Sequence, residues 1–98
     1  MDVRVRVPTQ LRDLVAGAAV VEVTVGGVAD GMATVATVLD GLAIQYPALE
    51  RRIRDERGRT RAHVNLFVGS DNVRDREGPA TPIIAGQELS IIPAVSGG

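Results

Sequence analysis

The sequence contains no cysteine, no tryptophan and no lysine, and its only aromatic residues are Tyr46 and Phe67. Without cysteine, a disulfide framework, a thiolate nucleophile and a cysteine-based metal site are all excluded. Because aromatic residues make up 2% of the chain and hydrophobic residues 45%, the core must consist of Val, Leu, Ile and Ala. All eleven cationic residues are arginines, so no side chain carries an amine that could be acylated.

The chain is also short and nearly neutral. Its 98 residues fit a single domain, and a net charge of −1 lacks the basic excess that nucleic-acid-binding surfaces need. No apolar run approaches the roughly 18 residues of a transmembrane helix, and no signal-peptide pattern opens the chain. We therefore expect a soluble cytoplasmic protein with small-molecule or protein partners, with no nucleic acid and no membrane among them.

Four stretches have the composition and periodicity of β-strands: residues 1–8, 20–25, 64–69 and 88–93. The first alternates strictly, with Val3, Val5 and Val7 on one face, as in a half-buried strand. The first two strands suggest an N-terminal hairpin with a long connection. In the last two strands, the same alternation places Phe67 and Ile92 together on the outer face of the sheet.

Between the hairpin and the third strand, the periodicity becomes that of a helix. Apolar residues recur at positions 35, 38, 39, 42 and 46, with Thr34 as the predicted N-cap and Pro47 as the stop. Gly41 costs about 1 kcal/mol against Ala in a helix, which is tolerable if the helix lies close to the sheet there. A short second helical segment is expected after Pro47, ending at Gly58.

The remaining segments are expected to be irregular. Residues 11–17 are predicted to be a turn or loop, and residues 73–74 a short return strand. Residues 75–86 contain two glycines and two prolines after Arg76, so we expect a loop with a single helical turn over 81–85.

The resulting order is strand, strand, helix, strand, short strand, loop, strand. In a compact α+β domain, one main helix packs across one face of a mixed sheet and leaves the other face free. This arrangement is the β-grasp, or ubiquitin-like, fold, in which the first and last strands lie parallel at the centre. We expect residues 1–92 to form this domain and residues 93–98 to form an extended, flexible C-terminal tail ending in Gly97-Gly98.

No pattern of side chains points to an enzyme. His63 is the single histidine and has no second ligand or base at a useful spacing, so we expect a strand-edge residue and no metal site. Residues 51–61 hold six arginines against Asp55 and Glu56. A solvated helix and loop is the simpler interpretation of this cluster, and docking to an acidic partner is the alternative.

The chemically distinctive group is the carboxylate of Gly98. An ATP-dependent partner can convert a carboxylate to an acyl-adenylate, and a sulfide or persulfide donor can then produce a thiocarboxylate. Two glycines alone fit a frayed end or a cloning remnant better than a functional tail. Their position after a β-grasp pattern and after Pro93, which restricts the backbone, favours a functional tail.

Three groups of residues resemble the ThiS/MoaD family of ubiquitin-like sulfur carrier proteins, and within it the actinobacterial CysO type. The groups are Val3-Arg4-Val5-Arg6-Val7-Pro8-Thr9; Val64-Asn65-Leu66-Phe67-Val68 with Asn72-Val73-Arg74; and Ala80-Thr81-Pro82-Ile83 with Gly86 and Ile91-Ile92-Pro93-Ala94-Val95-Ser96-Gly97-Gly98. The terminal motif is the most specific of these, whereas an alternating first strand is common.

The resemblance implies a protein co-substrate with no bound cofactor of its own. An E1-like adenylating and sulfurtransferase enzyme of the MoeB/ThiF type would use ATP to activate Gly98, which then carries the sulfur as a thiocarboxylate. Gly97, Ser96 and Val95 would thread into that enzyme. Phe67 and Ile92 would form an apolar docking patch for it.

The resemblance also implies downstream partners and alternatives. The sulfur acceptor would be a synthase, such as a PLP-dependent cysteine synthase, and a JAMM-type metalloprotease is a further partner. Within the same class, the small subunit of molybdopterin synthase and the thiamin-thiazole sulfur carrier compete with a role in cysteine biosynthesis. From another class, a ubiquitin-like protein modifier and a non-covalent interaction module remain open.

Overall fold

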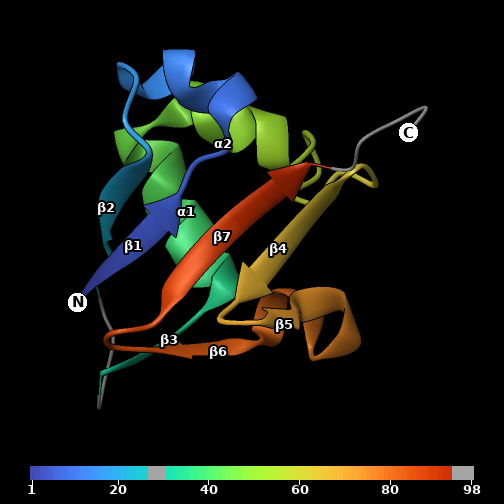
Figure 1. Ribbon diagram of the computed structural model, residues 1–98. Coiled ribbons are helices and arrows are strands. Elements are labelled where there is room, and N and C mark those ends of the chain that lie inside the picture. The colour runs from blue at the N-terminus through green and yellow to red at the C-terminus, as the bar shows by residue number, and fades with distance from the viewer. Residues whose placement is uncertain (27–30, 94–98) are drawn as a thin grey trace.

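A five-stranded mixed sheet forms the centre of the computed structural model, which describes residues 1–26 and 31–93 (Figure 1). In order across the sheet, the strands are β2 (Val20–Thr24), β1 (Asp2–Arg6), β7 (Glu88–Pro93), β4 (Val64–Val68) and β5 (Asp71–Asn72). Strands β1 and β7 run parallel, and the other neighbours run antiparallel. The first and last strands therefore lie side by side at the centre, which confirms the predicted β-grasp fold.

Two helices, α1 (Val35–Gln45) and α2 (Pro47–Ile53), pack on one face of the sheet and lie behind it in Figure 1. The other face of the sheet is turned toward the viewer. The alternating residues of the strands point to the helices as predicted: Val3, Val5 and Val7 are at most 2% exposed. Leu66, Leu89 and Ile91 complete this side of the core and are similarly buried.

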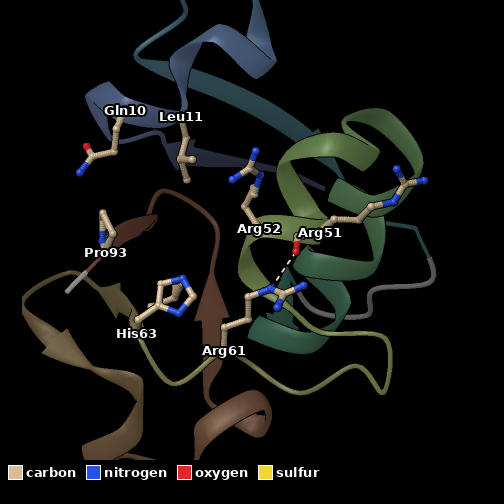
Figure 2. A pocket seen from close by; sticks show the side chains of 8 residues that line it. Gln10, Leu11, Arg51, Arg52, Arg61, His63 and Pro93 are labelled. Carbon is tan, nitrogen blue, oxygen red and sulfur yellow. Dashed lines mark hydrogen bonds between the residues drawn. The ribbon is translucent and has the colours of Figure 1, made fainter. Parts of the chain in front are cut away.

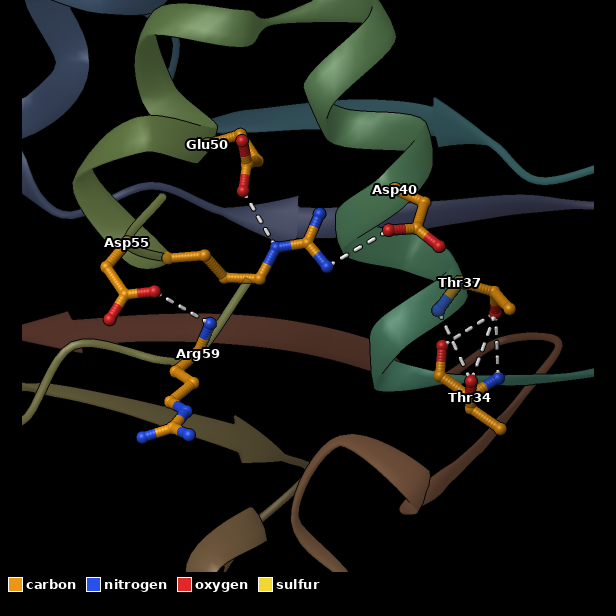
Figure 3. Close-up of polar contacts among 7 residues, drawn as sticks. Thr34, Thr37, Asp40, Glu50, Asp55 and Arg59 are labelled. Carbon is orange, nitrogen blue, oxygen red and sulfur yellow. Dashed lines mark hydrogen bonds and ion pairs between the residues drawn. The ribbon is translucent and has the colours of Figure 1, made fainter. Parts of the chain in front are cut away.

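Helix α1 begins where the sequence predicted. Thr34 is the N-cap, and its hydroxyl accepts a hydrogen bond from the backbone N–H of Thr37 at 3.3 Å. In return, the hydroxyl of Thr37 accepts from the N–H of Thr34 at 3.0 Å, which completes a capping box (Figure 3). Pro47 ends α1 and also begins α2, because the first turn of a helix does not need its missing N–H.

Gly41 lies where α1 packs directly against strand β2. A Cβ atom at this position would come within 2.8 Å of Val23 Cγ1 and 3.0 Å of the carbonyl oxygen of Thr24. The glycine thus allows the close approach of α1 to β2 that the sequence suggested. Beside it, the side-chain oxygen of Gln45 accepts a hydrogen bond from the N–H of Thr24 at 2.8 Å, so α1 also caps a backbone group of strand β2.

Two of the expected local structures around the helices are wrong. Helix α2 ends at Ile53 rather than at Gly58, because Asp55 accepts backbone hydrogen bonds from Arg57 at 2.9 Å and from Arg59 at 3.0 Å and holds a turn. Figure 3 shows the bond from Arg59. The predicted loop at 11–17 is instead a 3₁₀ helix, η1 (Thr9–Val15). Its ordering agrees with the burial of Val15 in the core.

The C-terminal half differs from prediction in its short elements. The return strand β5 lies at Asp71–Asn72, whereas Val73 begins the 3₁₀ helix η2 (Val73–Asp75), because the side chain of Asn72 accepts from the N–H of Arg74. A second 3₁₀ turn, η3 (Gly78–Ala80), follows.

The helical turn expected over 81–85 is also wrong. Residues Pro82–Ile84 form strand β6, which pairs antiparallel with β3 (Met32–Thr34) as a separate two-stranded sheet. The two strands are far apart in the sequence, so no local pattern predicts their pairing. Neither β3 nor β6 was predicted.

Candidate functional site

The candidate site is the region from which the C-terminal tail leaves the domain. Strand β7 extends through Pro93, one residue past the predicted end of the domain, and Pro93 lies opposite Val64 of β4. Strand β7 pairs with β1 over residues 88–90 and with β4 over residues 89–93, so β4 holds the backbone up to the residue before the tail. The predicted tail residues Val95, Ser96, Gly97 and Gly98 lie outside the described residues.

The predicted docking residues lie on the free face of the sheet. In the register of β4 and β7, Phe67 is opposite Ser90, and Ile92 is opposite Asn65. Residues two positions apart on a strand share a face, so Phe67 and Ile92 are diagonal neighbours on the outer face. Ile92 is 46% exposed, whereas Phe67 is partly buried.

Polar and charged groups border this apolar pair. Arg6 of β1 donates a hydrogen bond from Nε to Oε1 of Glu88 at 2.7 Å, and the side chain of Arg6 is 51% exposed. An ion pair this open to solvent adds little to stability. Its effect is to place fixed charges beside the apolar pair, which is a common composition for the edge of a protein interface.

A hollow of about 410 Å³, here called the open-face hollow, follows the outer side of β7 toward the tail. It is lined by Arg6, Val7, Pro8, Thr9, Gln10, Arg12, Ser90, Ile91, Ile92 and Pro93. Ile92 and Pro93 are therefore parts of one concave surface that begins on the free face and ends at the base of the tail.

A second hollow of about 430 Å³, here called the tail-base cleft, is also lined by Pro93 (Figure 2). It is lined by Gln10, Leu11, Arg51, Arg52, Arg61, His63, Val64 and Pro93. In Figure 2 these side chains come from η1, from α2, from the segment before β4 and from the end of β7. Four parts of the chain thus meet around the point where the tail begins.

The arginines of residues 51–61 have different roles in the structure. Arg54 is structural: its Nε donates to Glu50 Oε2 at 2.7 Å, its Nη1 lies 3.0 Å from Asp40 Oδ1, and its side chain is 13% exposed. Burial disfavours the charged guanidinium, but the hydrogen bonds to Glu50 and Asp40 and their negative charges outweigh it, so the pKa of Arg54 is raised. Arg54 therefore links α1 to α2 through Asp40 and Glu50, whose carboxylates are labelled in Figure 3.

The arginines of the tail-base cleft are differently placed. Arg61 donates from Nε to the backbone oxygen of Arg51 at 2.9 Å, which ties the segment before β4 to α2. Within residues 1–26 and 31–93, no carboxylate lies within 4.0 Å of the guanidinium nitrogens of Arg51, Arg52 or Arg61. The cleft is consequently a concentration of positive charge in a nearly neutral protein.

Sequence reasoning identified the arginine cluster and the tail separately. It did not place them together, since their proximity depends on where β7 ends relative to α2. His63, which was expected at a strand edge, lines the same cleft.

Among the residues that the structure describes, no group of three His, Cys, Asp or Glu side chains could hold a metal ion. None of the helices described is both long and apolar enough to cross a membrane.

Comparison with known proteins gives matches that extend over almost the entire chain. Residues 5–98 match the ThiS family. The chain is 33% identical to the sulfur carrier protein CysO of Mycobacterium tuberculosis, over the full length of both. It is 39% identical to small archaeal modifier protein 1 of Haloferax volcanii, over 86% of this chain and 87% of that protein.

The solved structures that resemble this chain include the same type of protein. A chain of the Amycolatopsis orientalis BexX/CysO complex superposes with a TM-score of 0.82 at 29% identity, covering 98% of this chain and 99% of the other. These relatives are small carrier or modifier proteins rather than enzymes. The relatives found by sequence and those found by structure are therefore of the same type.

Proposed function

The chain belongs to the ThiS family, and on this premise we propose that it is a sulfur carrier protein whose Gly98 carboxylate carries the sulfur. The observation that supports this most is the match to CysO, which covers 100% of both chains. The position of β7 supports it as well, because pairing with β4 extends through Pro93 and so presents the tail from a fixed base.

The proposed chemistry takes place in two steps. An oxygen of the Gly98 carboxylate attacks the α-phosphorus of ATP, so that an acyl-adenylate forms and pyrophosphate leaves. Hydrosulfide then attacks the acyl carbon, the bond from that carbon to the AMP oxygen breaks, and AMP leaves. The product is a thiocarboxylate, with one proton released. Gly97, Ser96 and Val95 would lie in the partner's active-site channel, where small residues leave room for the approach of the enzyme.

The proposed partners follow from this chemistry. An E1-like enzyme of the MoeB/ThiF type would catalyse both steps, and the thiocarboxylate would deliver sulfur in the biosynthesis of cysteine or of another sulfur-containing metabolite. A PLP-dependent cysteine synthase would be the acceptor, and a JAMM-type metalloprotease would be a further partner. That a CysO protein has been solved together with BexX supports a role in protein complexes. Because activation consumes ATP, we place the protein in the cytoplasm.

Intact-mass measurement tests the function directly. The purified chain is incubated with the adenylating enzyme of its own organism, ATP and sulfide. We expect a mass gain equal to the replacement of one oxygen by sulfur, located in the C-terminal peptide. A chain without residues 97–98 is the control and should stay unchanged. If the full chain also remains a plain carboxylate under these conditions, it is not a sulfur carrier.

We further propose that Phe67 and Ile92 contact the adenylating enzyme. The test is Ile92→Asp compared with Ile84→Asp, because Ile84 lies on β6 and is 49% exposed, close to the 46% of Ile92. Loss of a contacting aliphatic side chain should lower kcat/KM for adenylation about tenfold for Ile92→Asp, whereas Ile84→Asp should stay within about twofold of wild type. Equal rates for the two variants would contradict docking through this face.

A protein modifier is the second candidate, and the 39% identity to small archaeal modifier protein 1 favours it. In that case, the activated Gly98 would form an isopeptide bond with a lysine of another protein. Without lysine, the chain could not extend itself through its own side chains. Covalent adducts in lysates of the native host that vanish on deletion of residues 97–98 would identify this role, whereas a thiocarboxylate without adducts would identify the carrier.

A further inference from the structure

We propose that the tail-base cleft binds acidic side chains of the adenylating enzyme, at the rim of the opening through which the tail reaches its active site. The inference rests on the proposed function and adds to it a specific surface of this chain. Its key residues are Arg51 and Arg52 of α2, with Arg61 beside them.

The position of the cleft brings it within reach of the enzyme. Residues 94–98 follow Pro93, and five residues span at most about 18 Å even when fully extended. For Gly98 to react, the rim of the active site must therefore approach the surface around Pro93. Pro93 and Gln10 line both the tail-base cleft and the open-face hollow, so the two hollows together surround the start of the tail.

The charge of the cleft identifies the chemistry of the partner. Arg51 and Arg52 are exposed and adjacent on α2, and the described residues place no carboxylate within ion-pair distance of either. Arg61 is held next to them by its bond to the Arg51 backbone. Guanidinium groups bind carboxylates through paired N–H donors, so Asp or Glu side chains are the complementary groups.

Other anionic partners fit less well. The cleft contains no Phe, Tyr or Trp on which a nucleic-acid base could stack, and the net charge of the chain is −1. The cleft shares Gln10 and Pro93 with the open-face hollow, where Ile92 is exposed, which instead indicates a partner that covers apolar and cationic surface together. A protein surface has this mixed composition.

The experiment compares two double charge reversals in the same part of the chain. Arg51→Glu/Arg52→Glu alters the cleft, while Arg57→Glu/Arg59→Glu alters arginines that line other hollows. Both variants change the net charge by the same amount. The rate of pyrophosphate release with the adenylating enzyme of the same organism is measured over a range of carrier concentrations, at low and at high salt.

For Arg51→Glu/Arg52→Glu we expect kcat/KM about tenfold below wild type at about 20 mM salt, with the difference shrinking below about threefold at 0.5 M, because salt screens the attraction. The value of kcat at saturation should stay unchanged, since the cleft does not touch the reacting atoms. Arg57→Glu/Arg59→Glu should remain within about twofold of wild type. Thermal unfolding verifies the fold of both variants. If Arg51→Glu/Arg52→Glu does not fold, Arg51→Gln/Arg52→Gln replaces it, with a smaller expected loss in kcat/KM of about threefold.

The outcomes separate the two proposals. If wild type releases no pyrophosphate, the proposed function fails. If wild type reacts and the two double reversals are equally slow, net charge rather than the cleft is responsible, and the inference is overturned. Wild-type kinetics for the Arg51/Arg52 variants at low salt would overturn it as well, while leaving the sulfur carrier function in place.

Discussion

Replacing Gly41 with Ala should destabilise the protein, although the same change stabilises most helices. In an open helix, Ala is favoured over Gly by about 1 kcal/mol. Here the new Cβ would meet Val23 Cγ1 at 2.8 Å and the oxygen of Thr24 at 3.0 Å. Neither neighbour can move easily, because Val23 is 0% exposed and branched at Cβ, and the oxygen belongs to the strand backbone.

The size of the effect follows from these two opposing terms. Forcing an extra methyl group into a packed contact costs about 1–3 kcal/mol, and rigid neighbours favour the upper part of that range. After subtraction of the helix preference, the free energy of unfolding should decrease by about 1–2 kcal/mol. For a domain of this size, each kcal/mol corresponds to about 4–8 °C in Tm.

Chemical denaturation of Gly41→Ala, Ala43→Gly and Val23→Ala provides the assay. Ala43→Gly exchanges the same two residue types nearby in α1 and should lose about 1 kcal/mol from helix preference. In the Val23→Ala background, Gly41→Ala should cost about 1 kcal/mol less than in wild type, because one clashing atom is absent. A Gly41→Ala variant that is more stable than wild type would refute the close packing of α1 against β2.

Two further predictions concern charged residues around α2. Arg54→Met should lower the free energy of unfolding by about 2 kcal/mol in urea denaturation, because the largely buried carboxylate of Glu50 loses its partner. The double variant Arg54→Met/Glu50→Gln should recover part of that loss. No recovery would contradict the pairing. The backbone N–H of Arg59 holds the pKa of Asp55 below its ordinary value of 3.8 in the folded state. The unfolded state therefore takes up this proton first as the pH falls, so the stabilisation by Asp55 is present above the unfolded pKa and is lost as the pH falls through the folded pKa. Asp55→Asn should accordingly lose less stability than wild type between about pH 5 and pH 3, and parallel pH profiles would contradict this.

Much of the fold could be predicted because its signals are local. The alternation of Val3, Val5 and Val7 and the helical spacing after Thr34 each report which face of an element is buried, and the structure confirms both. The parallel pairing of β1 with β7 followed from the order of the elements. The shared face of Phe67 and Ile92 also followed from alternation alone.

The misplaced elements have a common cause. Strands β3 and β6 are three residues each, and each gains its hydrogen bonds from a partner distant in the sequence. Such a short segment has no periodicity to detect, so its structure depends on the partner. The 3₁₀ helix η1 likewise replaces a predicted loop, and its last residue, Val15, is buried in the core.

For the site, the sequence by itself determined the residue types: a Gly-Gly ending, an apolar pair on the outer strand face and a cluster of arginines. Only the tertiary structure decided which of these residues contact one another and which lie close together. It assigned Arg54 to an internal link with Glu50 and Asp40, and it placed Arg51, Arg52 and Pro93 in the lining of one cleft. The physical reason is that strand faces follow from the periodicity of single segments, whereas the tail-base cleft forms only when η1, α2, the segment before β4 and the end of β7 pack around a common core.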